Sequence, residues 1–574
     1  MESRNHSDRK RCAASSPSEG MSTSVLPTSA VLLSDSDIEK NRGKLGTASS
    51  SHPFTGTSAP IDLLPYELLL VVFELHTDAD TPVLSLATLM LVCKLWRTIV
   101  EGTPSLWCRI SGGERLSSIR KALAMTKDIP LEITYWEETA KTDPKIFFAQ
   151  IKDRIAQTKS ITVTANNCDS FNHLLAILET TVAPTLKTLQ LLVSWDLVWE
   201  RGAVTLFGGD QASPALKDFH VDYIQIALGP LRLSGLRSLQ LNDTSINSAE
   251  ELLRILRESP ALEGCSLQRL VFLTEFTLPE RQRQLRSQSS RTGPDCGAIR
   301  LLHLRHLALL GLPVSFTHFL LSNMQALTLL SFAVECQLRE SPASELLTAD
   351  ISHLAPALKG CTATAEEIEI NSLGEKSWTL YVGTLSIEIE GLPVEPGHVE
   401  EALDWVFGHL GEHLKALPTS FVSHEFDARA DLILWLGSNL RVTYLELWTG
   451  SWFDSERNEP RSIISFLSRP VVPPSDQWAL PDLESIDTNV LDEAGKLEIL
   501  EMVEARHSSI QAQENEGRDV TLKYFKEIRL HDARKDVSSE QASNEGFLVA
   551  IEKVGRGAEI WWDGAKWAGN ATSC

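Results

Sequence analysis

The chain of 574 residues carries 53 Lys and Arg against 76 Asp and Glu, which gives a formal charge of −23. Its length corresponds to roughly four domains of ordinary size, and its 43% hydrophobic and 22% charged residues are typical of a globular protein. The acidic excess argues against nucleic acid and against an anionic membrane as partners, because both attract basic proteins. No apolar run approaches the ~18 residues of a membrane span, so we expect a cytoplasmic or nuclear protein.

The cysteines do not form the clusters that disulfide scaffolds or zinc sites need. They are nine, an odd number, and no two have the C-x-x-C spacing. We therefore expect neither a disulfide framework nor a metal or other cofactor.

Residues 1–58 differ in composition from the rest. They are rich in Ser, Thr and Gly and contain few large apolar side chains. Such a segment cannot bury enough surface to offset the entropy of ordering it, so we predict a disordered tail. Its triplet Arg9-Lys10-Arg11 has two interpretations, a nuclear address and a solvated charge cluster.

Residues 59–112 have the pattern of three short helices. The first begins at Pro65, which the first turn of a helix tolerates, and Thr81-Pro82 opens the second. The third covers Lys94–Glu101 and stops at the following glycine. Three helices of this length form a marginal core by themselves, so a partner or the rest of the chain should complete it.

From residue 113 to 574, short strands alternate with amphipathic helices. The strands follow a loose L-x-x-L-x-L pattern. The clearest copies are Leu186–Leu191, Leu216–Val221, Leu236–Leu241, Leu267–Phe272 and Leu304–Leu309, and weaker ones are Leu329–Val334, Ala365–Ile370, Val442–Leu447, Leu483–Thr488 and Phe525–Leu530. One strand–helix unit cannot bury its own apolar face, so such units stack into a solenoid with parallel strands.

The repeat is irregular. The gap from Ile370 to Val442 is too long for one unit and holds a further strand-like segment, Leu380–Ile389. Ser248 begins a capping box for one of the helices, and Phe547–Trp562 has the pattern of one or two final strands. We therefore predict an α/β chain in which a three-helix block precedes an irregular solenoid.

The helical block resembles the F-box. The family pattern is L-P-x-E, an apolar helix ending in I/V-F, then V-C-x-x-W and P-S-L-W. The matching segments are Leu64-Pro65-Tyr66-Glu67, Val72-Phe73, Val92-Cys93-Lys94-Leu95-Trp96 and Pro104-Ser105-Leu106-Trp107. The remainder resembles the degenerate leucine-rich-repeat regions that follow F-boxes in large fungal families.

By this resemblance the F-box binds the Skp adaptor, which links it to a cullin and a RING ubiquitin ligase, while the repeats hold a protein substrate. The implied Skp contacts are Leu64, Pro65, Leu68, Leu69, Val72 and Phe73, and the implied F-box core is Leu91, Cys93, Trp96 and Trp107. Apolar side chains that exceed what a small helix buries mark an interface, although burial as internal core is the alternative.

The resemblance implies a substrate-recognition adaptor of a Skp–cullin–F-box (SCF) ubiquitin ligase without catalytic residues. The alternative is a non-catalytic interaction scaffold that does not take part in ubiquitin transfer.

Two segments are candidates for substrate contact. Arg281, Arg283 and Arg286 lie in a Gln/Ser-rich insertion and either bind phosphate or carboxylate groups or belong to a flexible loop. Trp448 and Trp452 follow a repeat strand. They either form part of a binding surface, where tryptophan is common, or fill a gap in the repeat.

One motif suggests an enzyme. His409-Leu-Gly-Glu412-His413 matches H-x-x-E-H, in which two histidines one helical turn apart hold zinc and the glutamate acts as base. The pattern supplies no third ligand, and Gly411 weakens a helix here. We therefore expect a solvated helix face and a protein that is not an enzyme.

Overall fold

The computed structural model describes most of the chain after residue 63. The described residues are 64–77, 80–194, 202–207, 216–228, 231, 233–274, 298–337, 349, 351–372, 377–390, 398–423, 430–448, 461–470, 477–490, 493–532 and 541–568. The predicted tail, 1–58, lies outside them. The chain divides into two compact units, Met1–Leu68 and Leu69–Cys574.

Helices and strands alternate along the described residues. The α-helices are α2 (Tyr66–His76), α3 (Pro82–Val92), α4 (Lys94–Gly102), α5 (Leu116–Met125), α6 (Pro144–Ile151), α7 (Cys168–Thr180), α8 (Ala249–Glu258), α10 (Val314–Asn323), α12 (Ala355–Thr362), α13 (His398–Leu410), α14 (Ala430–Asn439), α15 (Arg461–Leu467), α16 (Glu493–Asn515) and α17 (Gln541–Gly555). The 3-10 helices are η3 (Pro104–Trp107), η4 (Lys152–Gln157) and η5 (Glu412–Ala416).

The strands contribute to one large sheet and two small ones. They are β1 (Arg109–Ser111), β2 (Leu131–Trp136), β3 (Thr158–Ala165), β4 (Thr188–Val193), β5 (Asp218–Asp222), β6 (Ser238–Asn242), β7 (Ser245–Ile246), β8 (Gly264–Gln268), β9 (Val271–Phe272), β10 (Ile299–Arg300), β11 (His306–Leu312), β12 (Met324–Gln325), β13 (Ser331–Gln337), β14 (Ile368–Ser372), β15 (Ser377–Val382), β16 (Leu385–Glu390), β17 (Pro418–Ser423), β18 (Arg441–Leu447), β19 (Ser485–Val490), β20 (Glu527–Asp532), β21 (Glu559–Trp562) and β22 (Ala565–Lys566).

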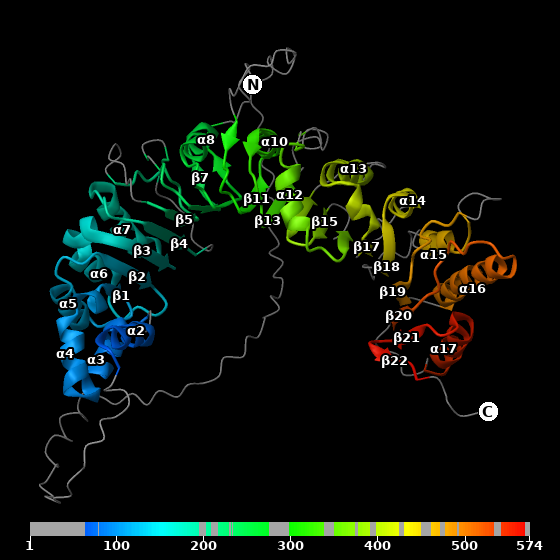
Figure 1. Ribbon diagram of the computed structural model, residues 1–574, viewed down its shortest axis with the longest axis horizontal. Helices are drawn as coiled ribbons and strands as arrows, with labels where there is room; N and C mark the ends of the chain where they lie inside the picture. Colours follow the sequence, from blue (N-terminus) through cyan, green and yellow to red (C-terminus); the bar gives the residue numbers. More distant parts are fainter. Residues whose placement is uncertain are drawn as a thin grey trace, which may run out of the picture. The chain divides into compact units, whose positions relative to one another are not determined.

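The large sheet is mostly parallel. Its strands lie in the order β1-β2-β3-β4-β5-β6-β8-β11-β13-β16-β15-β14-β17-β18-β19-β20-β21-β22. Only β15 and β22 run antiparallel to their neighbours among the described strands. Figure 1 shows α8, α10, α13 and α14 on one side of the strands.

The L-x-x-L-x-L pattern places its first apolar residue before the strand. In β4, Leu189 and Leu191 point into the core, and Leu186 is buried two residues ahead of the strand. The frame predicted for Leu267–Phe272 was wrong, because Leu267 is the last apolar residue of its copy and not the first. The strand is β8, whose buried residues are Cys265 and Leu267, with Leu262 ahead of it. Cysteine packs there as a small apolar residue.

Two other expectations differ from the structure. The segment Leu380–Ile389 is not one strand but the hairpin of β15 and β16, which turns at Gly383 with a φ of 63°. Much of Phe547–Trp562 is not strand, because α17 runs to Gly555 and only β21 and β22 follow. The apolar residues of α17 mimic a strand pattern over a short window.

Successive strands end in the same backbone geometry. Four residues that are paired across neighbouring strands, one each in β5, β6, β8 and β11, are each followed by a residue with φ between 46° and 59°. These following residues are Tyr223, Asp243, Arg269 and Gly311. The N–H of each of the first three donates to a carbonyl of the next strand, at 2.7–3.0 Å. A repeated left-handed turn with a repeated hydrogen bond is expected where units stack by one common operation.

The two faces of the sheet differ in burial. In β5, Phe219 and Val221 are buried toward the helices, while Asp218, His220 and Asp222 on the opposite face keep partial exposure. Alternation of this kind recurs from β2 to β18. The sheet therefore has one face covered by helices, which carries the core, and one polar face, which we call the open face.

Candidate functional site

Helix α2 presents a row of apolar side chains to solvent. Leu68, Val71, Val72 and Leu75 recur at intervals of three and four residues, which places them on one side of the helix. Their exposure ranges from 40% at Val72 to 82% at Leu75. We call these four residues the α2 stripe. Apolar side chains aligned and exposed in this way are typical of a surface that another protein covers.

Leu64 and Pro65 precede this helix and are also exposed. The carbonyl of Pro65 accepts the N–H of Leu68 at 3.0 Å, which begins the first helical turn. The fixed φ of proline favours a helix start at this point.

The opposite side of α2 belongs to the core. Leu69 and Phe73 are buried, and the Phe73 ring lies 4.9 Å from that of Trp96 in α4. The hydroxyl of Thr77 donates to the carbonyl of Phe73 at 2.7 Å and closes the helix end. The resemblance implied that Leu69 and Phe73 contact Skp. In the structure both side chains are buried, because helical periodicity turns them away from the α2 stripe.

The four residues expected in the F-box core divide into two pairs. Trp96 and Trp107 are buried, and the indole N–H of Trp107 donates to the carbonyl of Val100 at 2.8 Å. Leu91, by contrast, is 79% exposed, and Cys93 is exposed as well. The Cys93 sulfur accepts the N–H of Trp96 at 3.5 Å, so this residue caps α4 and does not fill the core.

Motif matching missed several exposed apolar residues. Val71 and Leu75 on α2, and Leu84 on α3, lie outside the family's short motifs, yet all three are exposed. Helical spacing was the signal that could have found them, since Leu68, Val71, Val72 and Leu75 fit one face once the helix is assumed.

The helical block is joined to the sheet by a buried carboxylate. Glu114 lies beyond the predicted end of the block, and its side chain accepts the N–H groups of Val83 and Leu84 at 2.7 and 3.0 Å. These two N–H groups begin α3 and have no partner within the helix. A carboxylate at a helix N-terminus also interacts favourably with the helix dipole. Glu114 therefore fixes the start of α3 against the sheet.

Replacing Glu114 by Ala should loosen α3. Two hydrogen bonds to a charged, buried acceptor are lost, which should lower the free energy of opening α3 by about 1–3 kcal/mol. Amide hydrogens of α3 should then exchange roughly tenfold faster or more. Hydrogen–deuterium exchange read by mass spectrometry measures this directly. Glu101→Ala, at an exposed glutamate of α4, is the control and should leave the exchange of α3 unchanged.

The predicted substrate contacts are only partly within the structure. Arg281, Arg283, Arg286 and Trp452 lie outside the described residues. Trp448 follows β18, and its ring stacks on that of His531 with centroids 5.1 Å apart. The indole N–H of Trp448 donates to the Glu446 carboxylate. Trp448 therefore belongs to a packed polar group on the open face.

Asp487 lies at the centre of this group. One of its carboxylate oxygens is 3.0 Å from Nε2 of His531, and the other accepts the Tyr444 hydroxyl at 3.4 Å. Tyr444 also donates to Glu446 at 2.8 Å. Burial raises the pKa of Asp487, and the nearby Glu446 charge raises it further against the opposing effect of His531. The pKa of Tyr444 is raised by burial and by its hydrogen bond to Glu446.

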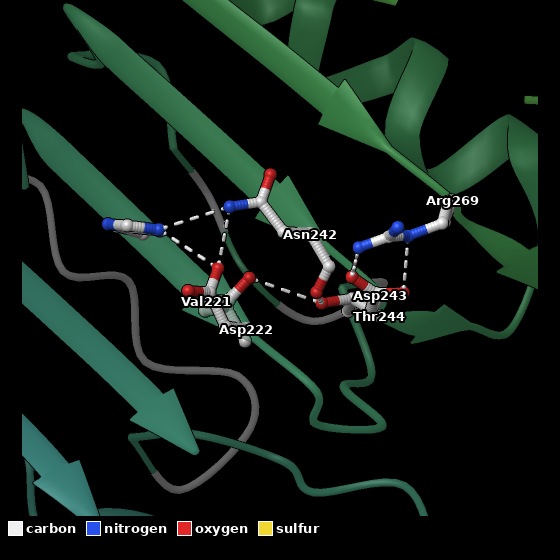
Figure 2. A network of polar contacts seen from close by, with 7 residues as sticks. Val221, Asp222, Asn242, Asp243, Thr244 and Arg269 are labelled. Atoms are coloured by element: carbon white, nitrogen blue, oxygen red, sulfur yellow. Dashed lines mark hydrogen bonds and ion pairs between the residues drawn. The ribbon is translucent and has the colours of Figure 1, made fainter. Parts of the chain in front are cut away.

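A second polar network, which the sequence did not suggest, lies on β5 and β6. Figure 2 shows the Asn242 amide pointing toward Asp222; it donates to that carboxylate at 2.7 Å, and the same oxygen lies 2.9 Å from Nε2 of His220. Beside it, Arg269 donates two hydrogen bonds of 2.7 Å to Asp243. Asp243 and Arg269 are the left-handed turn residues, so their ion pair ties adjacent units together.

The H-x-x-E-H segment does not form the helix that a zinc site of that class needs. His409 lies near the end of α13, where Nδ1 is 2.7 Å from the carbonyl of Trp405. Gly411 then has a φ of 109°, and Glu412 begins η5. His409 and His413 are therefore not one turn apart on a continuous helix. Among the described residues, no three His, Cys, Asp or Glu side chains gather in a way suited to a metal ion.

No helix in the described part of the chain has the length and apolar character needed to cross a membrane.

Comparison with known proteins addresses the helical block. Residues 61–112 match the family model described as F-box-like. This segment contains α2, α3, α4 and η3, and with them the α2 stripe. A search of curated proteins found no match to the chain. The chain thus carries an F-box-like domain at residues 61–112.

Proposed function

We propose that this protein is the substrate-recognition adaptor of an SCF ubiquitin ligase. The observation that carries the proposal is the α2 stripe, which lies within the segment that matches the F-box-like family. F-box domains generally bind Skp adaptors, and an exposed apolar helix face is suited to such a contact. Skp then connects the chain to a cullin. Ligases of this kind act in the cytoplasm and nucleus, in line with the expected location.

We further propose that residues 113–574 form an irregular leucine-rich-repeat-like solenoid that holds the substrate. The sequential parallel strands, the repeated left-handed turns and the repeated hydrogen bonds between strand ends support it. The open face offers a long polar surface that the described helices leave uncovered, and stacked-repeat proteins bind partners on extended surfaces of this kind.

The chain itself contributes no chemistry in this proposal. Ubiquitin transfer is performed by the other subunits, and the polar clusters of the open face serve packing and recognition. Trp448 stacks on His531 and donates to Glu446, so in this proposal it packs the open face.

Reconstitution separates the adaptor from the scaffold alternative. Purified chain, Skp, cullin and the RING subunit are mixed with ubiquitin and its activating and conjugating enzymes, together with proteins captured on the chain from cells treated with a proteasome inhibitor. The adaptor proposal expects captured proteins to be ubiquitinated only when the chain is present. Capture without ubiquitin transfer in the complete mixture would instead identify a scaffold.

A further inference from the structure

Two rows of residues cross the open face between β13 and β18, and neighbours within each row are paired in the sheet. The first row is Ala333, Ser386, Tyr381, Glu369, Ser420 and Tyr444. The second row is Glu335, Glu388, Thr379, Asn371, Val422 and Glu446. Neither row contains a lysine or an arginine. We call these two rows, with Glu390 beside them, the acidic face.

Glu388 occupies the middle of this negative charge. Burial raises the pKa of its carboxyl group, and the charges of Glu335 and Glu390 raise it further. Within the described residues, no cationic side chain forms an ion pair with Glu388 or Glu390. Like charges at neighbouring strand positions destabilise a sheet, so a cation placed here would relieve repulsion as well as gain attraction.

Polar atoms without partners lie in the same row. Thr379 is 1% exposed, and its hydroxyl has no hydrogen-bond partner in the described structure; the same holds for the buried Oδ1 of Asn371. Thr379 lies between Glu388 and Asn371 in the second row. Buried polar groups normally have partners, so these atoms offer sites that a donor on a ligand can satisfy.

Aromatic rings accompany the carboxylates. Tyr381 is 40% exposed and is paired with Glu369, and Tyr444 donates to Glu446. Carboxylates bind the guanidinium and ammonium groups of Arg and Lys, and aromatic faces attract the same cations. The combination therefore favours basic side chains over acidic or purely apolar ones.

The remainder of the open face has a different character. The same two rows continue from β2 to β11 as mainly Thr, Gln, Ser, Asn and Leu, with a single carboxylate, Asp222. That carboxylate already has His220 as a partner and also accepts the Asn242 amide, which Figure 2 shows. Asp218 of β5 lies on the same face outside these two rows. Beyond β18 the rows continue to Ser485 and Asp487 in β19 and to Glu527 and Arg529 in β20. Within the two rows, carboxylates are thus denser from β13 onward than from β2 to β11, and among the described strands the first arginine of the rows is Arg529.

We propose that the acidic face binds an extended, Lys/Arg-rich segment of a protein partner. The inference rests on the proposed function in that this partner is the substrate the adaptor recruits. Charge complementarity selects the partner and speeds its association, while Thr379 and Asn371 supply uncharged contacts that salt does not screen.

The test uses the full-length chain and a fluorescein-labelled peptide of alternating arginine and alanine, with alternating glutamate and alanine as its counterpart. Fluorescence anisotropy should show binding of the basic peptide alone, weakening at least tenfold between about 50 and about 300 mM salt. The double variant Glu369→Gln/Glu388→Gln should bind at least tenfold more weakly. Glu501→Gln/Glu504→Gln removes the same charge from exposed positions of α16 and should change affinity less than about twofold.

Equal weakening by both double variants would overturn the proposal, because net charge alone would then explain binding. A chain that binds neither peptide, or both alike, would overturn it as well. A basic peptide carrying a photo-crosslinking group provides a second measurement: crosslinks should map to β13–β18, and crosslinks confined to helices would contradict the assignment.

Skp co-purification with the same variants separates this proposal from the proposed function. Glu369→Gln/Glu388→Gln should retain Skp. If this variant loses the peptide and keeps Skp, the result tests the acidic face and leaves the adaptor role untouched. If the unaltered chain binds the peptide but never binds Skp, the adaptor role is refuted and the acidic face is not.

Discussion

Replacing Val71 and Leu75 of the α2 stripe by Asp should weaken binding of Skp at least 100-fold. Truncating an anchor of a protein interface typically costs about 2 kcal/mol or more, and an aspartate placed in an apolar contact adds the cost of burying a charge. Both side chains are at least half exposed, so the fold should tolerate the change. Titration of purified Skp by calorimetry measures the effect.

A matched pair of substitutions controls for surface charge. Val549 in α17 and Leu497 in α16 are also exposed apolar residues on helices, at 46% and 60%. Val549→Asp/Leu497→Asp should therefore bind Skp as the unaltered chain does. If the α2 double variant bound Skp with unchanged affinity, Skp would not use this helix.

A shortened chain that begins at residue 113 should fail to fold stably. The cut falls in a packed region, since a Cβ added at Gly113 would lie 2.6 Å from the carbonyl of Asp80, and the carbonyl of Gly112 accepts the N–H of Lys141 at 2.9 Å. Domain boundaries normally fall in exposed linkers. Removing the block takes away β1, which pairs with β2, and leaves the buried Glu114 without its α3 partners.

The comparison is with a chain that begins at residue 59 and keeps the helical block. Circular dichroism during heating should give one cooperative transition for that chain, and a melting temperature lower by 10 °C or more, or aggregation, for the chain from 113. Equal melting temperatures would mean that the sheet is stable without the helices. The helical block would then be a separate module.

The repeated strands were predictable because their apolar pattern is physically enforced. Most copies of L-x-x-L-x-L bury their first residue ahead of the strand and two more within it, as Leu236, Leu239 and Leu241 do around β6. Val442 differs, since it lies inside β18. Where cysteine replaced leucine at Cys265, the predicted frame slipped. The pattern also could not reveal that β14 and β16 exchange places, because strand order depends on connections and not on which residues are buried.

The candidate site was less accessible to sequence. Short motifs identified the F-box-like segment. They show which residues the family shares, but they do not show on which face of the helix each side chain lies. Phe73 and Leu75 illustrate this, since one is buried and the other 82% exposed. The acidic face was even less visible, because Glu335 and Glu388 are far apart in sequence and become neighbours only through the sheet register. Glu446 joins the same row from β18, with Thr379, Asn371 and Val422 between it and Glu388.

The most direct test of the central claim is hydrogen–deuterium exchange of the full chain with and without purified Skp. The adaptor role predicts a complex in which amides of α2 gain protection while those of β13–β18 on the open face do not change. Absence of a complex, or protection confined to residues outside the F-box-like domain, would contradict it.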